Sequence, residues 1–411
     1  MSRRVVVTGL GTISPVGNTV DEAWLSLLDG RSGAAAITKF DASNLKVRFA
    51  CEVKDFDPQA YISRKEARRY DKFVQYAIAA AQQAVDHAGL NAGFPDPDRT
   101  GVIIGSGIGG MQTYEDNCRA YITEGPDRVS PFFVPMFIPD MAAGLVSMRF
   151  GLKGPNFCTV SACASSANAI GESYDLIRRG AADAMVAGGS EAAITGLTVT
   201  AFANMKALSF RNDDPTTASR PFDKDRDGFV LADGGAIVVL ESLEHAEARG
   251  ATILGEIIGY GLSGDAYHIT SPPPGGEGAA KAIQECLADG NIDLAEVGYI
   301  NAHGTSTPVG DVAETRAVKS VFGDRARDLI FGSTKSMTGH LLGGAGAFEF
   351  IVSLLVVTRG KIPPTINQFT FDPDCDLDSA AGGMVERDVK VALSNSFGFG
   401  GHNVTLAVKG P

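Results

Sequence analysis

The sequence predicts an α/β protein. Short apolar runs alternate with segments of helical periodicity along all 411 residues, as in proteins whose strands and helices take turns. The apolar runs are largely continuous rather than alternating, which is typical of strands buried on both faces. Weak internal sequence similarity suggests a duplication, because residues 102–107 resemble 298–305 and residues 161–180 resemble 334–360. We therefore expect two α/β halves, 1–250 with a candidate nucleophile and 251–411 with candidate histidines.

The expected strands are short runs rich in valine, isoleucine, alanine and glycine. They are Arg4–Thr8, Gly101–Gly105, Ala184–Ala187, Ala236–Leu240, Gly255–Gly259, Gly298–Asn301, Leu329–Gly332 and Val404–Val408. The expected helices have apolar positions at helical spacing, and the third of them ends in cations and a glycine, an ordinary stop signal. They are Val20–Leu28, Arg64–Gly89, Ala167–Arg179, Ala279–Ala288, Asp311–Phe322 and Ala345–Thr358.

Composition narrows the class of protein. Apolar residues make up 44% and charged residues 20%, which fits a soluble globular chain with a large core. The net charge of −12 argues against a nucleic-acid-binding surface. Six cysteines without a Cys-x-x-Cys pair suggest neither a disulfide framework nor a zinc knuckle. The first apolar run is too short for a signal peptide, and Phe350–Val357 is too short to span a membrane, so we expect a cytoplasmic protein.

Cys163 is the first candidate catalytic residue. It follows the run Phe157–Ala162 and precedes small residues that open a helix. A helix N-terminus lowers the pKa of a thiol and so favours the nucleophilic thiolate. A buried structural cysteine is the alternative reading of this residue alone.

Two histidines strengthen the catalytic reading. His303 lies where an expected strand runs into Gly304–Thr307, and His340 follows Lys335 at the start of a Gly/Ala-rich helix. A third motif, Asn395–Gly401, supplies backbone that we expect to be flexible around two phenylalanines. Ligands of open α/β sheets bind where strands end, so the thiol and the two imidazoles should share one site.

Three patterns imitate other sites. Residues 105–110 read Gly-x-Gly-x-x-Gly after a strand, but no ribose-binding acid follows at the required distance. Residues 223–228 imitate a calcium loop whose twelfth position is Gly234 instead of glutamate. Cys163, His303 and His340 have zinc-ligand chemistry, yet no short-spaced pair anchors a metal, so we expect none.

The four motifs at 161–163, 301–307, 334–340 and 395–401 together resemble the β-ketoacyl-[acyl-carrier-protein] synthases over nearly the whole chain. The loop 105–110 and residues 130–135 are most similar to the synthase II branch of that family. The resemblance implies the thiolase fold, two duplicated α/β halves in five αβαβα layers, and a homodimer. It also implies decarboxylative condensation of an acyl thioester with malonyl-[acyl-carrier-protein] in fatty acid chain elongation, without a cofactor.

The same resemblance assigns roles residue by residue. Cys163 would carry the acyl group, His303 and His340 would stabilise the enolate, and Lys335, paired with Glu349, would hold the local charge. Phe399 would gate the site and help to form the oxyanion hole. Further matches concern substrate binding: Ile108, Phe133 and Phe202 for the acyl chain, with Phe133 reaching across the dimer, and Thr305 and Thr307 for the pantetheine arm. His402 stands where many members carry threonine, and we assign it no catalytic role.

Acyl carrier protein is acidic, so its docking on this acidic chain needs a local basic patch. Lys65, Arg68, Arg69 and Lys72 have the spacing of one helix face, and Lys206 with Arg211 could extend it. A solvated helix face is the alternative. We expect no nucleic-acid or membrane partner.

Two other functions compete with condensation. A cysteine hydrolase could use Cys163 with His303, but it would leave Lys335 and His340 without a role. A subunit that only shapes a chamber, like the chain-length factors, would lack the nucleophilic cysteine that this chain retains.

Overall fold

The computed structural model describes residues 3–411, which contain a mixed sheet of ten strands in the order β10-β9-β13-β14-β8-β1-β7-β6-β4-β5. Five strands come from the first half of the chain: β1 (Val5–Ile13), β4 (Thr100–Gly105), β5 (Asn156–Phe157), β6 (Ala184–Glu191) and β7 (Gly234–Ser242). The other five come from the second half: β8 (Gly255–Gly264), β9 (Val297–Asn301), β10 (Ile330–Gly332), β13 (Val391–Gly398) and β14 (His402–Lys409).

The two sets of five strands repeat one topology. In the first, β1, β7 and β6 are antiparallel neighbours, and β4 and β5 continue from β6 in parallel. In the second, β8, β14 and β13 are antiparallel, and β9 and β10 continue in parallel. A short antiparallel pairing of Val5–Val7 with Gly255–Ile257 joins the sets. The duplication expected from the internal sequence similarity is therefore present in the strand order.

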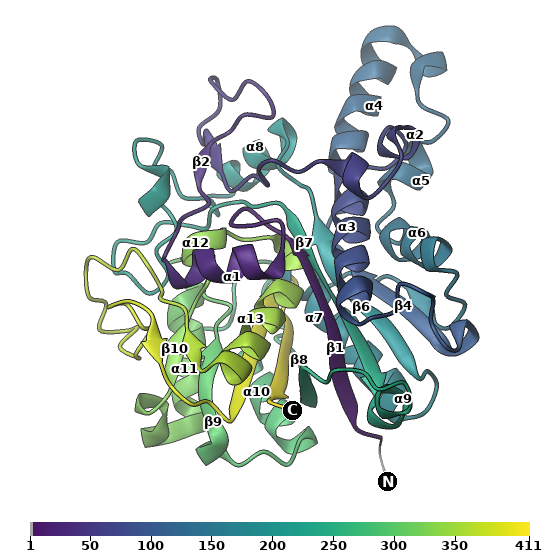
Figure 1. Ribbon diagram of the computed structural model, residues 1–411. Helices are drawn as coiled ribbons and strands as arrows, with labels where there is room; N and C mark the ends of the chain where they lie inside the picture. Colours follow the sequence, from purple (N-terminus) through teal and green to yellow (C-terminus); the bar gives the residue numbers. More distant parts are fainter. Residues whose placement is uncertain (1–2) are drawn as a thin grey trace.

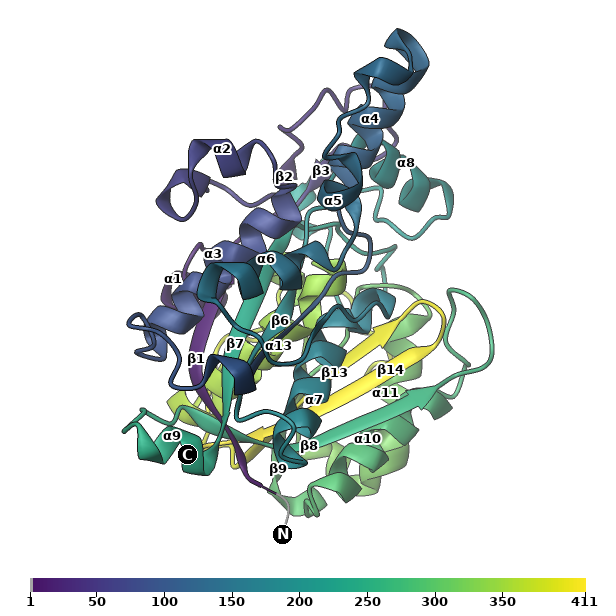
Figure 2. The same cartoon turned by 90° about the vertical axis from the view of Figure 1, so that its right-hand side faces the viewer.

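Helices complete five layers. The central layer is α7 (Ser165–Arg178) and α13 (Ala345–Arg359), which contact each other and strands of both sets (Figure 1, Figure 2). One outer layer, over the first set, contains α3 (Lys72–His87) and α6 (Met141–Phe150), and the other contains α10 (Glu277–Asp289) and α11 (Gly310–Phe322). The central helices are buried on nearly all sides, because apolar side chains from both sets of strands enclose them.

Smaller elements surround this body. The remaining helices are α1 (Val20–Leu28), α2 (Arg64–Ala67), α4 (Met111–Glu124), α5 (Phe133–Phe137), α8 (Gly196–Asn204), α9 (Leu243–Ala248) and α12 (Lys335–Thr338). Two short ladders pair β2 (Ala35–Ala36) with β3 (Phe49–Ala50) and β11 (Lys361–Ile362) with β12 (Val385–Glu386). Helix α4 projects from the layered body, with α5 beside it (Figure 1, Figure 2).

The single helix expected over Arg64–Gly89 is wrong, because the chain contains two helix starts there. Ser63 and Glu66 form a capping box that opens α2, and the Asp71 side chain then caps the N-terminus of α3. The basic residues of 65–72 therefore do not form one continuous helix face. They remain exposed, on α2, on the connection that follows it and at the start of α3.

The expected flexible backbone of Asn395–Gly401 is also corrected. Its first four residues belong to β13, which pairs with both β14 and β9. Sequence reasoning missed this strand because serine, asparagine and glycine interrupt its apolar run. One stretch, Leu342–Arg359, is long and apolar enough to cross a membrane, but 83% of it is buried inside the protein as part of the central layer.

Candidate active site

Cys163 lies in a tight turn at the entrance to α7. Ala162, Cys163 and Ala164 form a single 3₁₀ turn, and Ala162 has a φ of 52°, a conformation that costs a non-glycine residue about 1–3 kcal/mol. The buried Ser165 hydroxyl holds the turn by donating to the Ala162 carbonyl oxygen at 2.7 Å and accepting from the Ser161 amide at 3.0 Å. The turn therefore fixes the thiol at the junction of the two halves.

The duplicated turn in the second half precedes α13. Leu342 has a φ of 47° and opens the 3₁₀ turn Leu342–Gly344. By this correspondence Gly343 stands where Cys163 stands in the first half, and His340 lies three residues earlier. The resemblance of 161–180 to 334–360 therefore does not put His340 at the place of Cys163 in the repeat, although both residues face the same centre.

His340 is the imidazole in contact with the thiol. Its Nε2 lies 3.0 Å from the Cys163 Sγ. The backbone of His340 is pinned on both sides, because its amide donates to the Val230 carbonyl at 2.7 Å and its carbonyl accepts from the Ala232 amide at 3.0 Å. A cysteine hydrolase built on Cys163 and His303 does not match this geometry, since the hydrogen bond joins Cys163 to His340.

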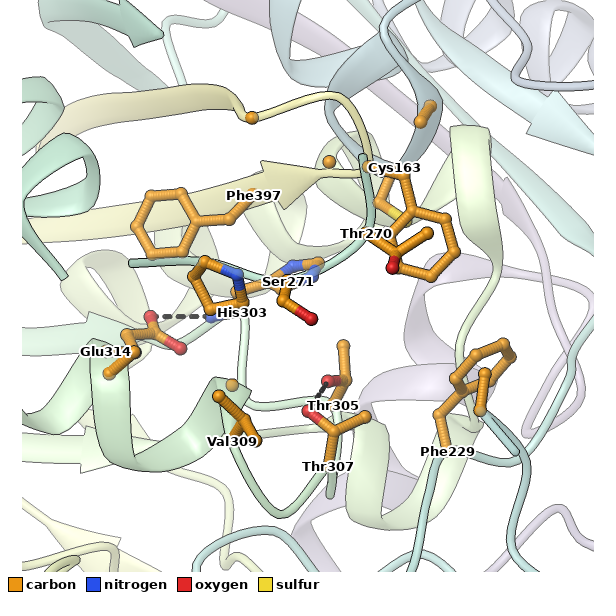
Figure 3. Close-up of a pocket in the computed structure, with 18 of the residues that line it drawn as sticks. Cys163, Phe229, Thr270, Ser271, His303, Thr305, Thr307, Val309, Glu314 and Phe397 are labelled. Atoms are coloured by element: carbon orange, nitrogen blue, oxygen red, sulfur yellow. Dashed lines mark hydrogen bonds between the residues drawn. The ribbon is translucent and has the colours of Figure 1, made fainter. Parts of the chain in front are cut away.

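His303 occupies the loop that follows β9. The Glu314 carboxylate of α11 accepts from the His303 amide at 2.9 Å and from the Gly304 amide at 2.8 Å, and the Asn395 amide group donates to it at 3.1 Å (Figure 3). The ring of His303 lies 5.4 Å from that of His340, nearly perpendicular to it. A buried carboxylate thus holds the second imidazole beside the first.

Lys335 and Glu349 form the expected ion pair beneath the histidines. Both side chains are almost fully buried, and the ammonium hydrogen-bonds one carboxylate oxygen while the other, Oε2, has no partner in the described part of the chain. Burial raises the pKa of Glu349 to about 7, although the ammonium of Lys335 opposes that rise.

Burial controls the charge of the reacting groups. It raises the pKa of Cys163 to about 12, outweighing the Lys335 ammonium and the Phe399 backbone N–H, which both lower it. Burial and Lys335 hold the pKa of His340 and His303 well below the usual range. The expectation that the helix N-terminus leaves a low thiol pKa is therefore wrong. The resting pair at neutral pH is a thiol and a neutral imidazole.

A cavity of about 500 Å³ opens from this cluster. Its lining is mainly apolar near the sulfur and polar toward the opposite end, where the Thr305 and Thr307 hydroxyls hydrogen-bond each other at 3.1 Å (Figure 3). The candidate residues that border it are Ile108, Cys163, Phe202, Lys206, His303, Thr305, Thr307, His340 and Phe399.

Gly398 brings Phe399 to the sulfur. A Cβ at Gly398 would lie 2.4 Å from the Ser161 carbonyl oxygen, so only glycine permits the end of β13 to pack against the cysteine turn. This packing brings the backbone N–H of Phe399 close enough to the Cys163 sulfur to lower the pKa of the thiol.

Other candidates lie away from the cavity of one chain. Phe133, on α5, stacks on Phe137 at 5.7 Å and does not line it. Lys65, Arg68 and Arg69 do not line it either, and Figures 1 and 2 show α2 apart from α8, which Lys206 follows.

Sequence reasoning missed several residues that support the site. Glu314 holds the His303 loop, and Phe229 packs edge-on against the His340 ring at 5.3 Å. Glu314 had a usable signal, because it is an acid among the apolar residues of the buried face of an expected helix. Phe229 had none, since an isolated aromatic gives no indication of its neighbours.

The three candidate zinc ligands do converge. One ligand atom from each of Cys163, His303 and His340 lies within 4.8 Å of the others. Long separations along the chain were therefore no argument against a metal, because the duplicated fold brings distant loops together. Thiolate and imidazole suit zinc chemically, whereas the fixed thiol–imidazole hydrogen bond suits acyl transfer.

Comparison with known proteins identifies the class. Residues 2–246 match the Beta-ketoacyl synthase N-terminal domain, and residues 254–369 match the Beta-ketoacyl synthase C-terminal domain. The chain belongs to the β-ketoacyl synthase family. The 3-oxoacyl-[acyl-carrier-protein] synthase 2 of Synechocystis sp. is 54% identical over 407 residues, which is 99% of this chain and 98% of that protein.

Two solved structures share the whole fold. A β-ketoacyl synthase from Burkholderia phymatum superimposes with a TM-score of 0.93 at 36% identity, with all of both chains covered. A type II PKS acyl-carrier protein in complex with its ketosynthase, bound to the hexaketide, contains a chain that matches with a TM-score of 0.92 at 35% identity, again with full coverage. The expected thiolase-like α/β fold is confirmed.

Proposed function

We propose that this chain is an acyltransferase that condenses an acyl thioester with malonyl-[acyl-carrier-protein], releasing CO2 and 3-oxoacyl-[acyl-carrier-protein], in fatty acid chain elongation. The observation that carries this proposal is the buried Cys163 thiol, 3.0 Å from His340 Nε2, with His303 as a second imidazole on the same cavity. Family membership and the synthase 2 relative support the same reaction.

The first step transfers the acyl group to the enzyme. The neutral imidazole of His340 accepts the thiol proton at Nε2 while the Cys163 sulfur attacks the thioester carbonyl. The carrier thiol leaves and takes up that proton, so the products are acyl-cysteine and free carrier thiol. Backbone N–H groups of Cys163 and Phe399 stabilise the oxyanion, since the Phe399 N–H lies close enough to the sulfur to lower the pKa of the thiol.

The second step removes CO2 from the malonyl thioester. Once Cys163 is acylated, the thiol no longer donates to His340, so a ring N–H of His340 and one of His303 can donate to the malonyl thioester oxygen. Negative charge grows on this oxygen as the carbon–carboxylate bond breaks. One such donor is worth about 3 kcal/mol of barrier. Both imidazoles are neutral, so each carries one ring N–H that can donate to this oxygen.

The third step joins the two fragments. The enolate carbon attacks the acyl-cysteine carbonyl, the carbon–carbon bond forms, and the sulfur leaves as a thiolate. The thiolate takes up a proton from solvent, the one proton that the overall condensation consumes. Decarboxylation drives this sequence, so it requires no cofactor. Lys335 places a positive charge beneath the histidines, and the paired Glu349 keeps that charge tolerable in the interior.

Binding roles follow from the two ends of the cavity. Ile108 and Phe202 lie on its apolar lining and are proposed to contact the acyl chain. Thr305 and Thr307 present hydroxyls that suit the amide groups of pantetheine. Phe399 gates the passage between the acyl chain and the malonyl site.

We propose acyl carrier protein as the macromolecular partner. It would dock on the exposed basic residues on α2 and just after it, which are Lys65, Arg68 and Arg69, and also on Lys206, which borders the cavity. A cytoplasmic location, where this carrier acts, is part of the same proposal. The solved complex of a related ketosynthase with an acyl-carrier protein supports it.

We also propose a homodimer of chains that each comprise the halves 1–250 and 251–411. Strand β5 forms one edge of the large sheet. Exposed apolar side chains gather on this strand, just after it, and on the region of α5 and α6: Phe157, Val160, Phe132 and Met148. A partner on this face would bring a second Phe133 toward the acyl chamber. Sedimentation velocity should give twice the monomer mass.

The experiment for the function is a product assay. Malonyl- and acyl-[acyl-carrier-protein] are mixed with the enzyme, and the carrier-bound product is identified by mass spectrometry. The proposal expects a carrier-bound 3-oxoacyl chain that is two carbons longer, with one CO2 released. Free fatty acid as the sole product would instead identify a hydrolase.

A further inference from the structure

The glycine-rich loop 105–110 has a function unrelated to dinucleotide binding, because its N–H groups surround a carboxylate of the same chain. Glu191, the last residue of β6, is fully buried. Its Oε1 accepts from the Ser106 hydroxyl at 2.9 Å, the Ile108 amide at 3.2 Å and the Gly109 amide at 3.3 Å. Its Oε2 accepts from the Gly107 amide at 2.7 Å.

The same carboxylate reaches the other half of the protein. Its Oε2 also accepts from the Gly343 amide at 3.0 Å, in the turn that opens α13. Within residues 3–411, no ion pair with a lysine, arginine or histidine neutralises Glu191. Five hydrogen-bond donors, four of them backbone amides, therefore surround this carboxylate and lower its pKa, although burial still raises the pKa overall.

The packing around Glu191 leaves no room for a side chain at Gly107 or at Gly343. A Cβ on Gly107 would lie 2.9 Å from Glu191 Oε2, and a Cβ on Gly343 would lie 2.7 Å from the same atom. A Cβ on Gly107 would also lie 3.4 Å from the Ala162 carbonyl oxygen, so the loop lies directly against the cysteine turn. Gly107 of the motif and Gly343 of the other half are thus needed for this close approach.

The second half contains a comparable arrangement, although its carboxylate comes from α11 and not from the strand that corresponds to β6. The loop 106–109 follows β4, the second strand of its half, as the loop of His303 follows β9 in the other half. Glu314 accepts from the amides of His303 and Gly304 as Glu191 accepts from those of Gly107 and Ile108. Each half therefore places one buried carboxylate under the loop that carries a site residue.

We propose that Glu191 is a positioning residue for acyl-chain selection: by binding the Ile108 loop and the Gly343 turn together, it fixes the apolar lining next to Cys163. Ile108 and Leu342 both line the cavity. The amide of Ile108 donates to Glu191, and Leu342 directly precedes Gly343, whose amide donates to the same carboxylate. This inference rests on the proposed condensation, because it concerns the acyl chain that Cys163 receives. Without the carboxylate, Ile108 and Leu342 are no longer held in fixed positions beside Cys163. Acyl chains of different length should then react at more similar rates.

The test measures Cys163 acylation by acyl-[acyl-carrier-protein] of graded chain length, together with malonyl decarboxylation. For Glu191→Gln we expect the kcat/KM ratio between the best and poorest chain lengths to shrink at least about threefold. Decarboxylation should change less, because Glu314 holds the His303 loop independently. Ser106→Ala removes one donor to Oε1 and should shift the length profile in the same direction by a smaller amount.

A matched control is Glu241→Gln, which alters a buried carboxylate at the other end of the neighbouring strand β7, paired there with Arg249. It should lower stability while leaving the length profile unchanged. The proposal is overturned if both Glu191→Gln and Ser106→Ala keep the wild-type dependence on chain length. If Glu191→Gln does not fold, the chain-length profile of Ser106→Ala alone decides. Failure of the wild-type enzyme to accept any acyl chain would instead count against the proposed function.

Discussion

The sulfur of Cys163 lies 3.0 Å from Nε2 of His340, yet the two groups are a neutral thiol and a neutral imidazole at neutral pH. Burial disfavours both the thiolate and the imidazolium, so it acts against a preformed ion pair. The nucleophile is therefore generated during acyl transfer, when the substrate carbonyl and the leaving thiol take up the displaced charge. This view of the site leads to predictions that differ from those for a resting thiolate.

Alkylation of Cys163 should increase with pH over a wide range. With a pKa of about 12, the thiolate fraction rises about 10-fold per pH unit between pH 7 and 10. The iodoacetamide rate, followed by peptide mass spectrometry, should rise in step without a plateau. The Cys163→Ala protein provides the background from the other cysteines. A plateau reached near pH 7 would show that Cys163 is already ionised in the resting protein.

Replacement of the nucleophile should separate the two half-reactions. Cys163→Ala abolishes condensation, but it leaves His303 and His340 in place, so malonyl decarboxylation should continue at a measurable rate. Condensation product and released CO2 are measured side by side. Cys158→Ala, which changes a partly buried cysteine of the same loop, is the matched control and should retain both activities. Loss of both activities in a folded Cys163→Ala protein would contradict this division of roles.

The buried pair of Lys335 and Glu349 should show strong coupling. Lys335→Met leaves the Glu349 carboxyl buried without its cation. The carboxyl must then stay ionised in the interior or bind a proton, and either should destabilise the protein by about 3–5 kcal/mol. Adding Glu349→Gln removes the orphaned acid, so the double variant should recover most of the lost free energy of unfolding in urea titrations. Decarboxylation should stay impaired in both. A double variant no more stable than the single one would mean that the Lys335 charge does not compensate for the cost of burying the Glu349 carboxyl.

Charge reversal near α2 should affect only carrier-bound substrates. Lys65→Glu with Arg68→Glu should raise KM for acyl-[acyl-carrier-protein] about 10-fold or more at low salt, because like charges repel the acidic partner. KM for a pantetheine thioester mimic should stay the same. Lys390→Glu, which alters an exposed lysine just before β13, at the end of that strand opposite Gly398, is the control. Equal changes for both substrates would remove these residues from the docking surface.

The sequence was sufficient for the alternation of strands and helices, the duplication and the identities of Cys163, His303 and His340. These follow from periodicity and from motifs whose chemistry is local. The sequence could not place Phe229 against His340 or Glu191 under the Ile108 loop, because such contacts join segments that are far apart along the chain. It also missed the break between α2 and α3, where two capping signals outweigh a long helical period.

The error in the thiol pKa has a physical origin that no sequence pattern reveals. A helix N-terminus favours the thiolate, but the extent of desolvation depends on what packs over the turn. Here Gly398 allows the end of β13 to cover Cys163, and burial outweighs the favourable dipole, Lys335 and the Phe399 N–H. Motifs thus indicated the candidate reacting atoms, and packing determined their charge.

Intact-protein mass spectrometry after incubation with acyl-[acyl-carrier-protein] tests the central claim most directly. The account predicts one acyl group per chain, released by hydroxylamine, mapped to Cys163 and absent from Cys163→Ala, with a yield that depends on chain length. An unmodified Cys163 at every chain length, in protein that still forms the 3-oxoacyl product, would contradict the covalent mechanism.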